Sequence, residues 1–135
     1  MSITRLDKLE VDLGISTTER EKIVASVRDG SLKPGYLLTV SSDAKTIKGE
    51  KQGYLTGIMY LTPANGSGFA NLCVSASPGC KIACLNTSGH GNPQMGSTVQ
   101  RARLIRTAYW QYQRANFWTM LVLSLIHISE PTRPY

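Results

Sequence analysis

The sequence predicts an α/β protein in which an apolar strand, a cysteine-rich loop and a capped helix follow one another. Residues 54–61 (YLTGIMYL) form the best candidate strand of the chain, dense in apolar and aromatic residues. Residues 71–91 contain all three cysteines among serine, proline and glycine, and a helical pattern begins at Ser97. In α/β proteins the functional loops follow the carboxyl ends of strands. The cysteine loop therefore occupies the position where a functional site is expected.

Residues 1–35 are predicted to form an extended arm followed by a short amphipathic helix. Ser16 and Glu19 stand in capping-box register, and Gly30 is a typical helix stop. The start of the chain, MSITRLDKLEVDLG, lacks the basic and apolar regions of a signal peptide. A cytoplasmic protein with reduced thiols is therefore expected.

The following segment predicts a strand, a polar loop and a second strand. Residues 36–40 come after the Pro34-Gly35 turn and fit a strand. Residues 42–53 are polar and contain glycine, so they are predicted to be a loop or a hairpin tip. Residues 54–61 are apolar almost throughout, which predicts a strand buried on both faces, as in a parallel sheet.

A helix is predicted from Ser97 to about Asn116, because Ser97 and Gln100 again stand in capping-box register. Its expected buried face carries residues at three- and four-residue spacing: Leu104, Ile105, Ala108, Tyr112 and Ala115. The opposite face carries Trp110 with three arginines, Arg103, Arg106 and Arg114. This stripe suggests a contact with nucleic acid or another anion. The simpler alternative is a solvated or packed helix face.

Cys73, Cys80 and Cys84 are predicted to bind a cofactor or a metal. All three thiols lie within twelve residues, in the pattern Cys-x6-Cys-x3-Cys. Reduced thiols so placed favour ligands over disulfides. They suit either a [4Fe–4S] cluster with one open iron or a zinc site completed by His90 or water. The alternatives are cysteines that only pack in the interior and a His90 in a solvent-exposed turn.

Residues 123–135 (LSLIHISEPTRPY) resemble the translation of a sequencing-library adapter, so the native chain is expected to end near Val122. His127 is then not a ligand candidate, and the apolar residues 117–128 are too short to span a membrane. The formal net charge of +6 would attract phosphates or nucleic acid but does not identify such a partner.

Three runs of this sequence resemble the bacteriophage gene product 88 family over approximately residues 37–122: AKTIKGEKQGYLTGIMYLTPA, NLCVSASPGCKIACLNTSGHG and VQRARLIRTAYW. The SPGC-x3-C element is also similar to phage gene product 37 and gene product 68 proteins, which carry a three-cysteine signature and resemble radical SAM enzymes. The resemblance implies an N-terminal fragment of a partial radical SAM-like barrel, with residues 36–122 as a truncated α/β domain.

This resemblance also sets the expected function. It implies an uncharacterised phage protein in the cytoplasm of the infected host, with an iron–sulfur cluster on Cys73, Cys80 and Cys84. S-adenosylmethionine (SAM) or another small molecule would bind at the open iron, although the cysteine spacing differs from the Cys-x3-Cys-x2-Cys pattern of radical SAM enzymes. The alternative is a zinc-braced, non-enzymatic protein that binds nucleic acid or a protein partner. Neither function involves a membrane, and the sequence does not decide whether the protein is an enzyme.

Overall fold

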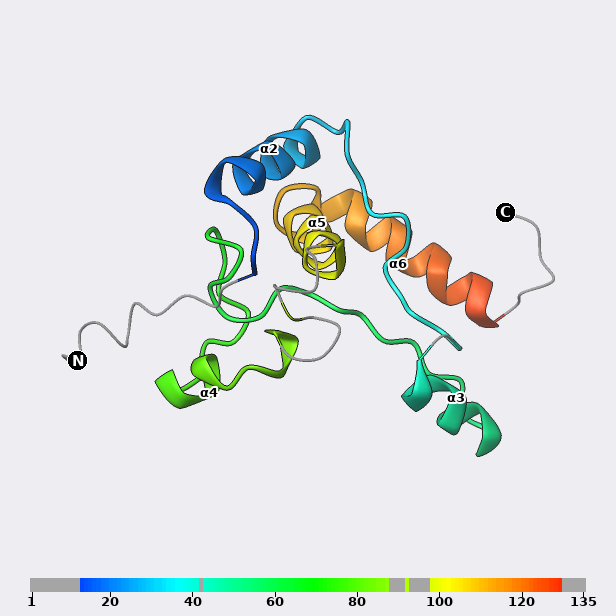
Figure 1. Ribbon diagram of the computed structural model, residues 1–135. Helices are drawn as coiled ribbons and strands as arrows, with labels where there is room; N and C mark the ends of the chain where they lie inside the picture. The colour runs from blue at the N-terminus through cyan, green and yellow to red at the C-terminus, as the bar shows by residue number, and fades with distance from the viewer. Residues whose placement is uncertain (1–12, 42, 88–91, 93–97, 130–135) are drawn as a thin grey trace.

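The chain is arranged as helices and extended segments around one central helix. The structure, a computed structural model, describes residues 13–41, 43–87, 92 and 98–129. Figure 1 shows α5 at the centre, α2 and α6 beside it, and α3 and α4 at the periphery. The helices are α2 (Thr17–Arg28), α3 (Ala44–Lys51), α4 (Pro78–Ile82), the 3-10 helix η1 (Leu85–Thr87), α5 (Thr98–Tyr112) and α6 (Arg114–Ser129).

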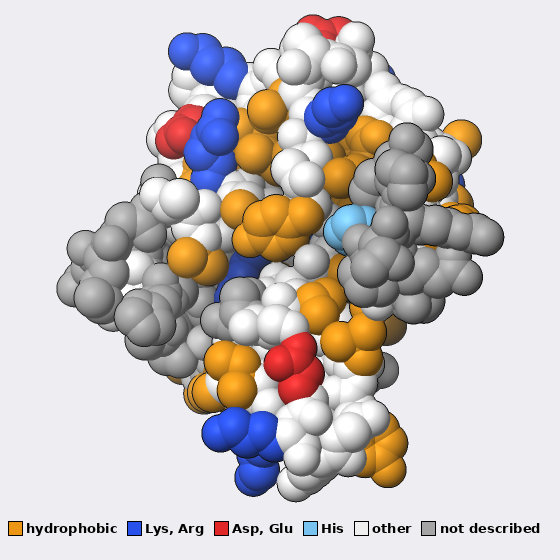
Figure 2. All heavy atoms as spheres, turned by 90° about the vertical axis from the view of Figure 1, so that its right-hand side faces the viewer, with side chains coloured by type: hydrophobic (Ala, Val, Ile, Leu, Met, Phe, Trp, Pro, Cys, Tyr) orange, Lys and Arg blue, Asp and Glu red, His pale blue; other side chains and the backbone are white. Residues whose placement is uncertain are grey.

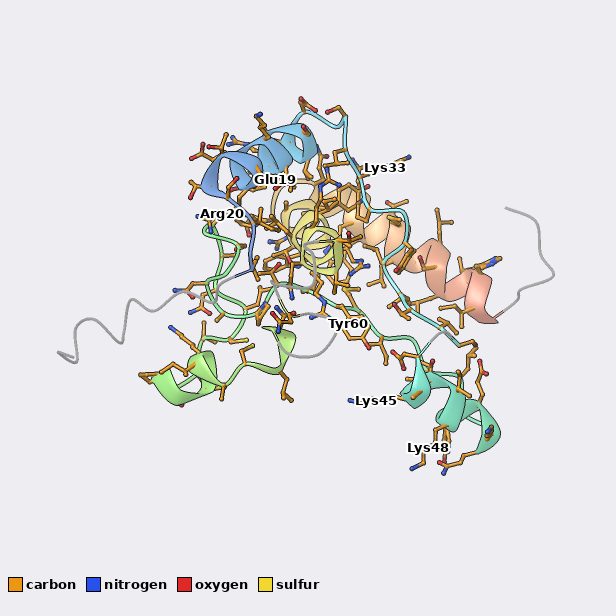
Figure 3. All side chains as sticks on the ribbon, viewed as in Figure 1. Glu19, Arg20, Lys33, Lys45, Lys48 and Tyr60 are labelled. Atoms are coloured by element: carbon orange, nitrogen blue, oxygen red, sulfur yellow. The ribbon has the colours of Figure 1, made fainter. Side chains whose placement is uncertain are left out.

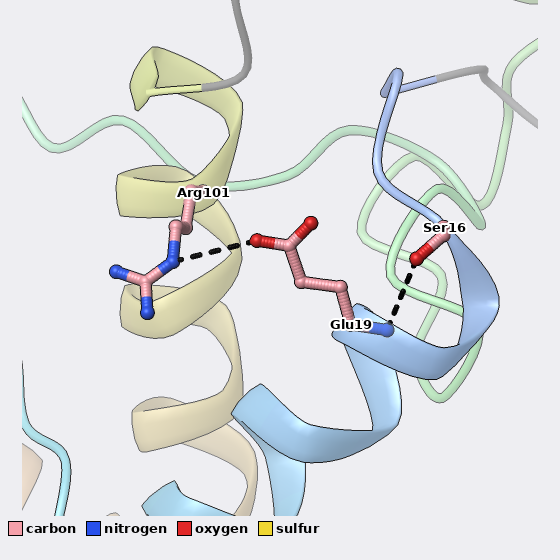
Figure 4. Close-up of polar contacts among 3 residues, drawn as sticks. All are labelled: Ser16, Glu19 and Arg101. Atoms are coloured by element: carbon pink, nitrogen blue, oxygen red, sulfur yellow. Dashed lines mark hydrogen bonds and ion pairs between the residues drawn. The ribbon is translucent and has the colours of Figure 1, made fainter.

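Helix α2 confirms the helix predicted within residues 1–35. Ser16 is its N-cap, and the Ser16 Oγ accepts a 3.2 Å hydrogen bond from the Glu19 backbone N–H. The chain leaves the helix through Gly30, whose φ of +85° is a backbone conformation that favours glycine. Glu19 also forms a 3.8 Å ion pair with Arg101 of α5, shown in Figure 4. Because this pair is solvent-exposed, it contributes at most about 1 kcal/mol.

The core lies where α5 meets α2 and α6. The predicted apolar face of α5 is confirmed for Leu104, Ile105 and Ala108, which are buried. They pack with residues from α2, α6 and the segment after α2: Ile23, Val27, Leu37 and Phe117. Full burial of an aliphatic side chain stabilises a fold by about 1.5–3 kcal/mol, so this cluster is the main apolar contribution to stability.

The predicted helix over residues 97–116 is divided into two. Helix α5 ends at Tyr112, and α6 begins at Arg114, on the far side of Gln113. The side chain of Gln113, between the two helices, donates hydrogen bonds to two carbonyl oxygens of α2, those of Val27 (3.2 Å) and Arg28 (3.1 Å). Gln113 therefore adds a hydrogen bond to each of two carbonyls in the last turn of α2, of which the Val27 carbonyl also accepts from the Gly30 N–H.

The predicted α/β class and the radical SAM-like barrel are wrong for this structure. Among the described residues, strand pairing is limited to one isolated antiparallel bridge between Thr39 and Ile58. The Thr39 N–H donates to the Ile58 carbonyl at 2.7 Å, and the Ile58 N–H donates back at 3.0 Å. The order of apolar segment, cysteine loop and helix holds, but the segment is not a strand of a sheet.

Residues 54–61 differ from the predicted buried strand for a physical reason. Tyr54 and Leu55 are 70% and 54% exposed, so the run is not buried on both faces. Where the segment crosses α5, side chains of that helix take the place of a neighbouring strand. The Tyr60 carbonyl accepts from Arg106 Nη1 at 3.0 Å, and the Thr62 N–H donates to Thr107 Oγ1 at 2.9 Å. Backbone groups satisfied in this way need no sheet.

The loop or hairpin tip predicted for residues 42–53 is instead the helix α3. Its N-cap is Asp43, which forms a capping box with Thr46. Lysines lie in its last turn, where a positive charge stabilises a helix. Gly49, which suggested a loop, lies inside the helix. A side chain at this position would be too close to the following segment, since a Cβ there would come within 2.9 Å of Thr56 Oγ1. Close packing accounts for this glycine.

Helix α6 is continuous across the predicted native end at Val122. That boundary stays a prediction. Figure 2 looks onto the side of the molecule where α6 lies and shows apolar side chains at the surface. Exposed residues of α6 include Trp118, Val122 and Leu125. Even so, among the described helices none has the length and apolar character required to cross a membrane.

Candidate functional site

The described part of the cysteine loop, residues 71–87, lies between the turn after the extended segment and helix α5. At its start the Leu72 N–H donates to the Ala64 carbonyl at 3.1 Å. Asn71 Oδ1 accepts from the Cys73 N–H at 3.0 Å, which turns the chain at the first cysteine. The first cysteine is therefore held by local hydrogen bonds, without a sheet beneath it.

The second cysteine lies on the short helix α4. Ser77 is the N-cap, and its Oγ accepts from the Cys80 N–H at 3.1 Å. Pro78 occupies the first helical position, where its missing N–H costs nothing. Cys80 is exposed to solvent. The sequence Ser-Pro-Gly-Cys thus fixes the backbone around Cys80 while its thiol remains accessible.

The first and third cysteines lie closer to the interior. Cys73 and Cys84 are half-buried, and both pack against one small apolar cluster formed by Leu13 and Ala64. All three cysteines are free of disulfides. In the parts of the chain that the structure describes, no group of three His, Cys, Asp or Glu side chains is placed to hold a metal ion. His90, the predicted zinc ligand, lies outside the described residues.

Asn86 and Gln100 connect the end of the cysteine loop to α5. Asn86 Nδ2 donates to Gln100 Oε1 at 2.8 Å, and Gln100 Nε2 donates to the Asn86 carbonyl at 2.7 Å. Gln100 is fully buried. Arg103 adds a third contact by donating to Asn86 Oδ1. The loop is consequently attached to the central helix two residues after its last cysteine.

Arg103 carries a positive charge within electrostatic range of the last cysteine, Cys84. Its guanidinium lies 4.9 Å from the centre of the Tyr60 ring. Burial lowers the pKa of Arg103, while the charges of Tyr60 and Cys84 oppose that shift. An arginine remains charged throughout the physiological range. Arg103 is thus a cation that could offset the charge of a thiolate at Cys84. In Figure 3, the labelled Tyr60 lies near the middle of the molecule.

The other two arginines of the predicted stripe are in different situations. Arg106 is only 6% exposed, and it donates to the carbonyl oxygens of Tyr36 (3.2 Å) and Tyr60 (3.0 Å). Arg114 lies in α6, exposed, with its guanidinium 4.2 Å from the Trp110 ring centre. The three do not form one continuous surface. The predicted contact with nucleic acid stays a prediction.

Sequence reasoning missed the residues that hold this site together. Asn86 and Gln100 carry the loop attachment, and Tyr60 covers Arg103 while its hydroxyl donates to Asp43 Oδ2 at 2.7 Å. Gln100 lies 14 residues from Asn86, and Tyr60 lies 17 residues from Asp43 and 43 residues from Arg103. No local motif marks such pairs. The one available signal was the presence of uncharged amides next to the last cysteine and at the start of the following helix.

The comparisons with known proteins identify a family for this chain. A family model described as Gene product 88 matches residues 36–129. The matched range contains the whole cysteine loop, the Arg103 network and α6, and it begins after α2. No curated protein and no solved structure matches the chain.

Proposed function

Because the chain belongs to the bacteriophage gene product 88 family, we propose that it is a phage protein whose cysteine loop holds a metal centre through Cys73, Cys80 and Cys84. The observation that supports this most is the shared packing of Cys73 and Cys84 on the Leu13–Ala64 cluster. One of these cysteines comes early in the loop and the other near its end. Cys80 lies between them in the chain, on a helix of only five residues.

Binding requires a local rearrangement, since the three thiols are not gathered as a ligand set among the described residues. Helix α4 would have to turn Cys80 toward Cys73 and Cys84. Loss of an N-cap hydrogen bond such as that of Ser77 costs about 1 kcal/mol. Thiolate-rich sites bind zinc with about 10–16 kcal/mol of apparent free energy at neutral pH. The gain from coordination is therefore large beside the cost of that one hydrogen bond.

An iron–sulfur cluster is the centre we favour. Thiolates are the usual ligands of such clusters, and three of them leave one iron of a [4Fe–4S] cluster without a protein ligand. That iron would accept a small molecule, for which SAM is one candidate. Arg103 supports an anionic centre because its guanidinium lies within electrostatic range of Cys84.

Anaerobic reconstitution of the full chain with iron and sulfide tests the proposal. Visible absorption and bound iron should appear in the parent protein and in Ser75→Ala, a control on the exposed part of the same loop. Both signals should be lost when Cys73, Cys80 or Cys84 is replaced by serine. A parent protein that takes up no iron and sulfide, or cysteine variants that retain both, would contradict the proposal.

Zinc is the alternative outcome of the same experiment. Stoichiometric zinc that is lost in the cysteine variants, without sulfide, would replace the cluster with a bracing zinc site. An Arg103→Gln variant separates the role of the arginine from that of the ligands. It should still bind the metal centre, but it should lose the centre faster to a chelator, because the balancing charge is gone.

A further inference from the structure

A pocket separate from the cysteine loop contains no cysteine and serves none of the functions described above. It has a volume of about 340 Å³ and lies between α2, the turn at residues 67–69, and Tyr112 at the end of α5. Pockets that bind small molecules have volumes of about 300–1,000 Å³. In Figure 3, the labelled Arg20 marks the end of α2 that faces this turn.

One wall of the pocket is apolar and aromatic. The rings of Phe69 and Tyr112 lie 5.3 Å apart between centroids, tilted by 54°. Val24 and Ala25 of α2 continue this wall. Two aromatic rings beside small aliphatic groups suit a planar ligand, because a ring of the ligand could make the same tilted or offset contact with Phe69 that aromatic pairs prefer.

The charged groups of the pocket favour an anion. Arg20 and Arg28 both line it, against the single carboxylate of Glu21, so the ionisable lining groups sum to one positive charge. Arg28 follows Arg20 by eight positions, which corresponds to about 12 Å along the helix axis. Arg28 lies over the Tyr112 ring at 5.0 Å, so a guanidinium and an aromatic face adjoin.

The pocket is preformed on the side of the turn. Ser67 Oγ accepts hydrogen bonds from the backbone N–H groups of Phe69 (3.4 Å) and Ala70 (3.2 Å). Gly68 has φ of +82°, and a Cβ there would come within 3.0 Å of the Arg20 Cζ. Glycine therefore allows Arg20 to lie against the turn, where its Nη1 donates to the Gly66 carbonyl at 3.3 Å. A preformed wall lowers the entropic cost of binding.

We propose that this pocket binds a small anionic ligand with a planar ring, of the class of a nucleoside monophosphate. The phosphate would interact with the exposed Arg28, and the ring would pack on Phe69, Val24 and Ala25. The site does not depend on the metal proposal, because it shares no residue with the cysteine loop. It also uses α2, which lies outside the region matched by the family model.

Isothermal titration calorimetry of the full chain with adenosine 5′-monophosphate, at low and at high salt, tests the site. The parent protein should bind the nucleotide more tightly than either adenosine or inorganic phosphate, and salt should weaken binding. Arg28→Gln should weaken the nucleotide about tenfold, as expected when one charged contact of about 1.4 kcal/mol is removed. Ala25→Leu should weaken it by occupying the apolar wall without changing any charge.

Arg114→Gln is the matched control, because Arg114 also lies over an aromatic ring, that of Trp110 at 4.2 Å, but outside the pocket. It should leave nucleotide binding unchanged. Circular dichroism of each variant checks that α2 is retained. The proposal is overturned if the parent protein binds no nucleotide, if Arg28→Gln binds it as the parent does, or if inorganic phosphate binds equally well.

Discussion

Arg106 Nη1 donates a 3.0 Å hydrogen bond to the carbonyl oxygen of Tyr60 and so ties the extended segment before the cysteine loop to the central helix. The same guanidinium donates to the Tyr36 carbonyl and lies 5.0 Å from the Tyr36 ring centre. A single buried arginine thus holds two extended segments against α5. In a fold whose described residues contain no sheet, this contact replaces strand pairing.

Replacing Arg106 by alanine should therefore destabilise the protein by about 2–4 kcal/mol, since two partly buried carbonyls lose a charged donor. Arg114→Ala is the control, because Arg114 is exposed. It should cost less than about 1 kcal/mol. Urea unfolding followed by circular dichroism measures both. Equal midpoints for the two variants would mean that Arg106 does not hold the segments.

Gln113 should act as a cap for α2. Gln113→Ala removes hydrogen bonds to the Val27 and Arg28 carbonyls and is expected to cost about 1 kcal/mol. Gln111→Ala is the control, because it removes a glutamine side chain that makes no such hydrogen bond to α2. The difference between the unfolding midpoints of the two variants measures how much the Gln113 cap stabilises the protein. Equal midpoints would contradict a capping role.

The contact between Asp43 and Tyr60 should make stability depend on pH. The hydrogen bond from the Tyr60 hydroxyl lowers the pKa of Asp43 below its ordinary value of 3.8. A lowered carboxyl pKa adds stability above about pH 4, and that stability is lost as pH falls through the lowered pKa. Tyr60→Phe should therefore lower the melting temperature at pH 7, and the deficit should shrink below pH 4.

The matched control for this contact is Tyr54→Phe, an exposed tyrosine of the same segment. Its melting temperature should follow that of the parent protein at every pH. If Tyr60→Phe showed the same deficit at pH 3 as at pH 7, the Asp43 carboxylate would not be the partner that matters.

The three cysteines should differ in reactivity before any metal is bound. Cys80 is exposed, whereas Cys73 and Cys84 are half-buried against Leu13 and Ala64. Brief alkylation of the metal-free protein with N-ethylmaleimide, followed by peptide mass spectrometry, should modify Cys80 first. After metal loading all three should be protected. Equal rates in the metal-free protein would contradict the described arrangement of the loop.

Helices α2 and α5 could be predicted from the sequence because their signals are local. The caps at Ser16 and Gly30 and the spacing of Leu104 and Ala108 lie within single helices. The strand prediction for residues 54–61 failed because an apolar run of that length does not distinguish a strand from an extended segment. The groups that satisfy its backbone, on Arg106 and Thr107, lie more than forty residues away.

The candidate site was predictable by residue type but not by arrangement. Three cysteines in one loop are visible in the sequence, as is Arg103. The contact of Cys73 and Cys84 with Leu13 and Ala64 depends on tertiary packing. The prediction that Arg103, Arg106 and Arg114 share an outer face assumed one straight, half-exposed helix. That assumption fails at Gln113 and at the buried Arg106.

The most direct test of the metal proposal is the iron and acid-labile sulfide content of the protein purified without oxygen, beside Cys80→Ser. Cys80 is the informative position because it is exposed and makes no core contact that its loss would disturb. The account predicts iron with matching sulfide in the parent protein and neither in the variant. No iron, iron without sulfide, or equal amounts in both proteins would contradict it.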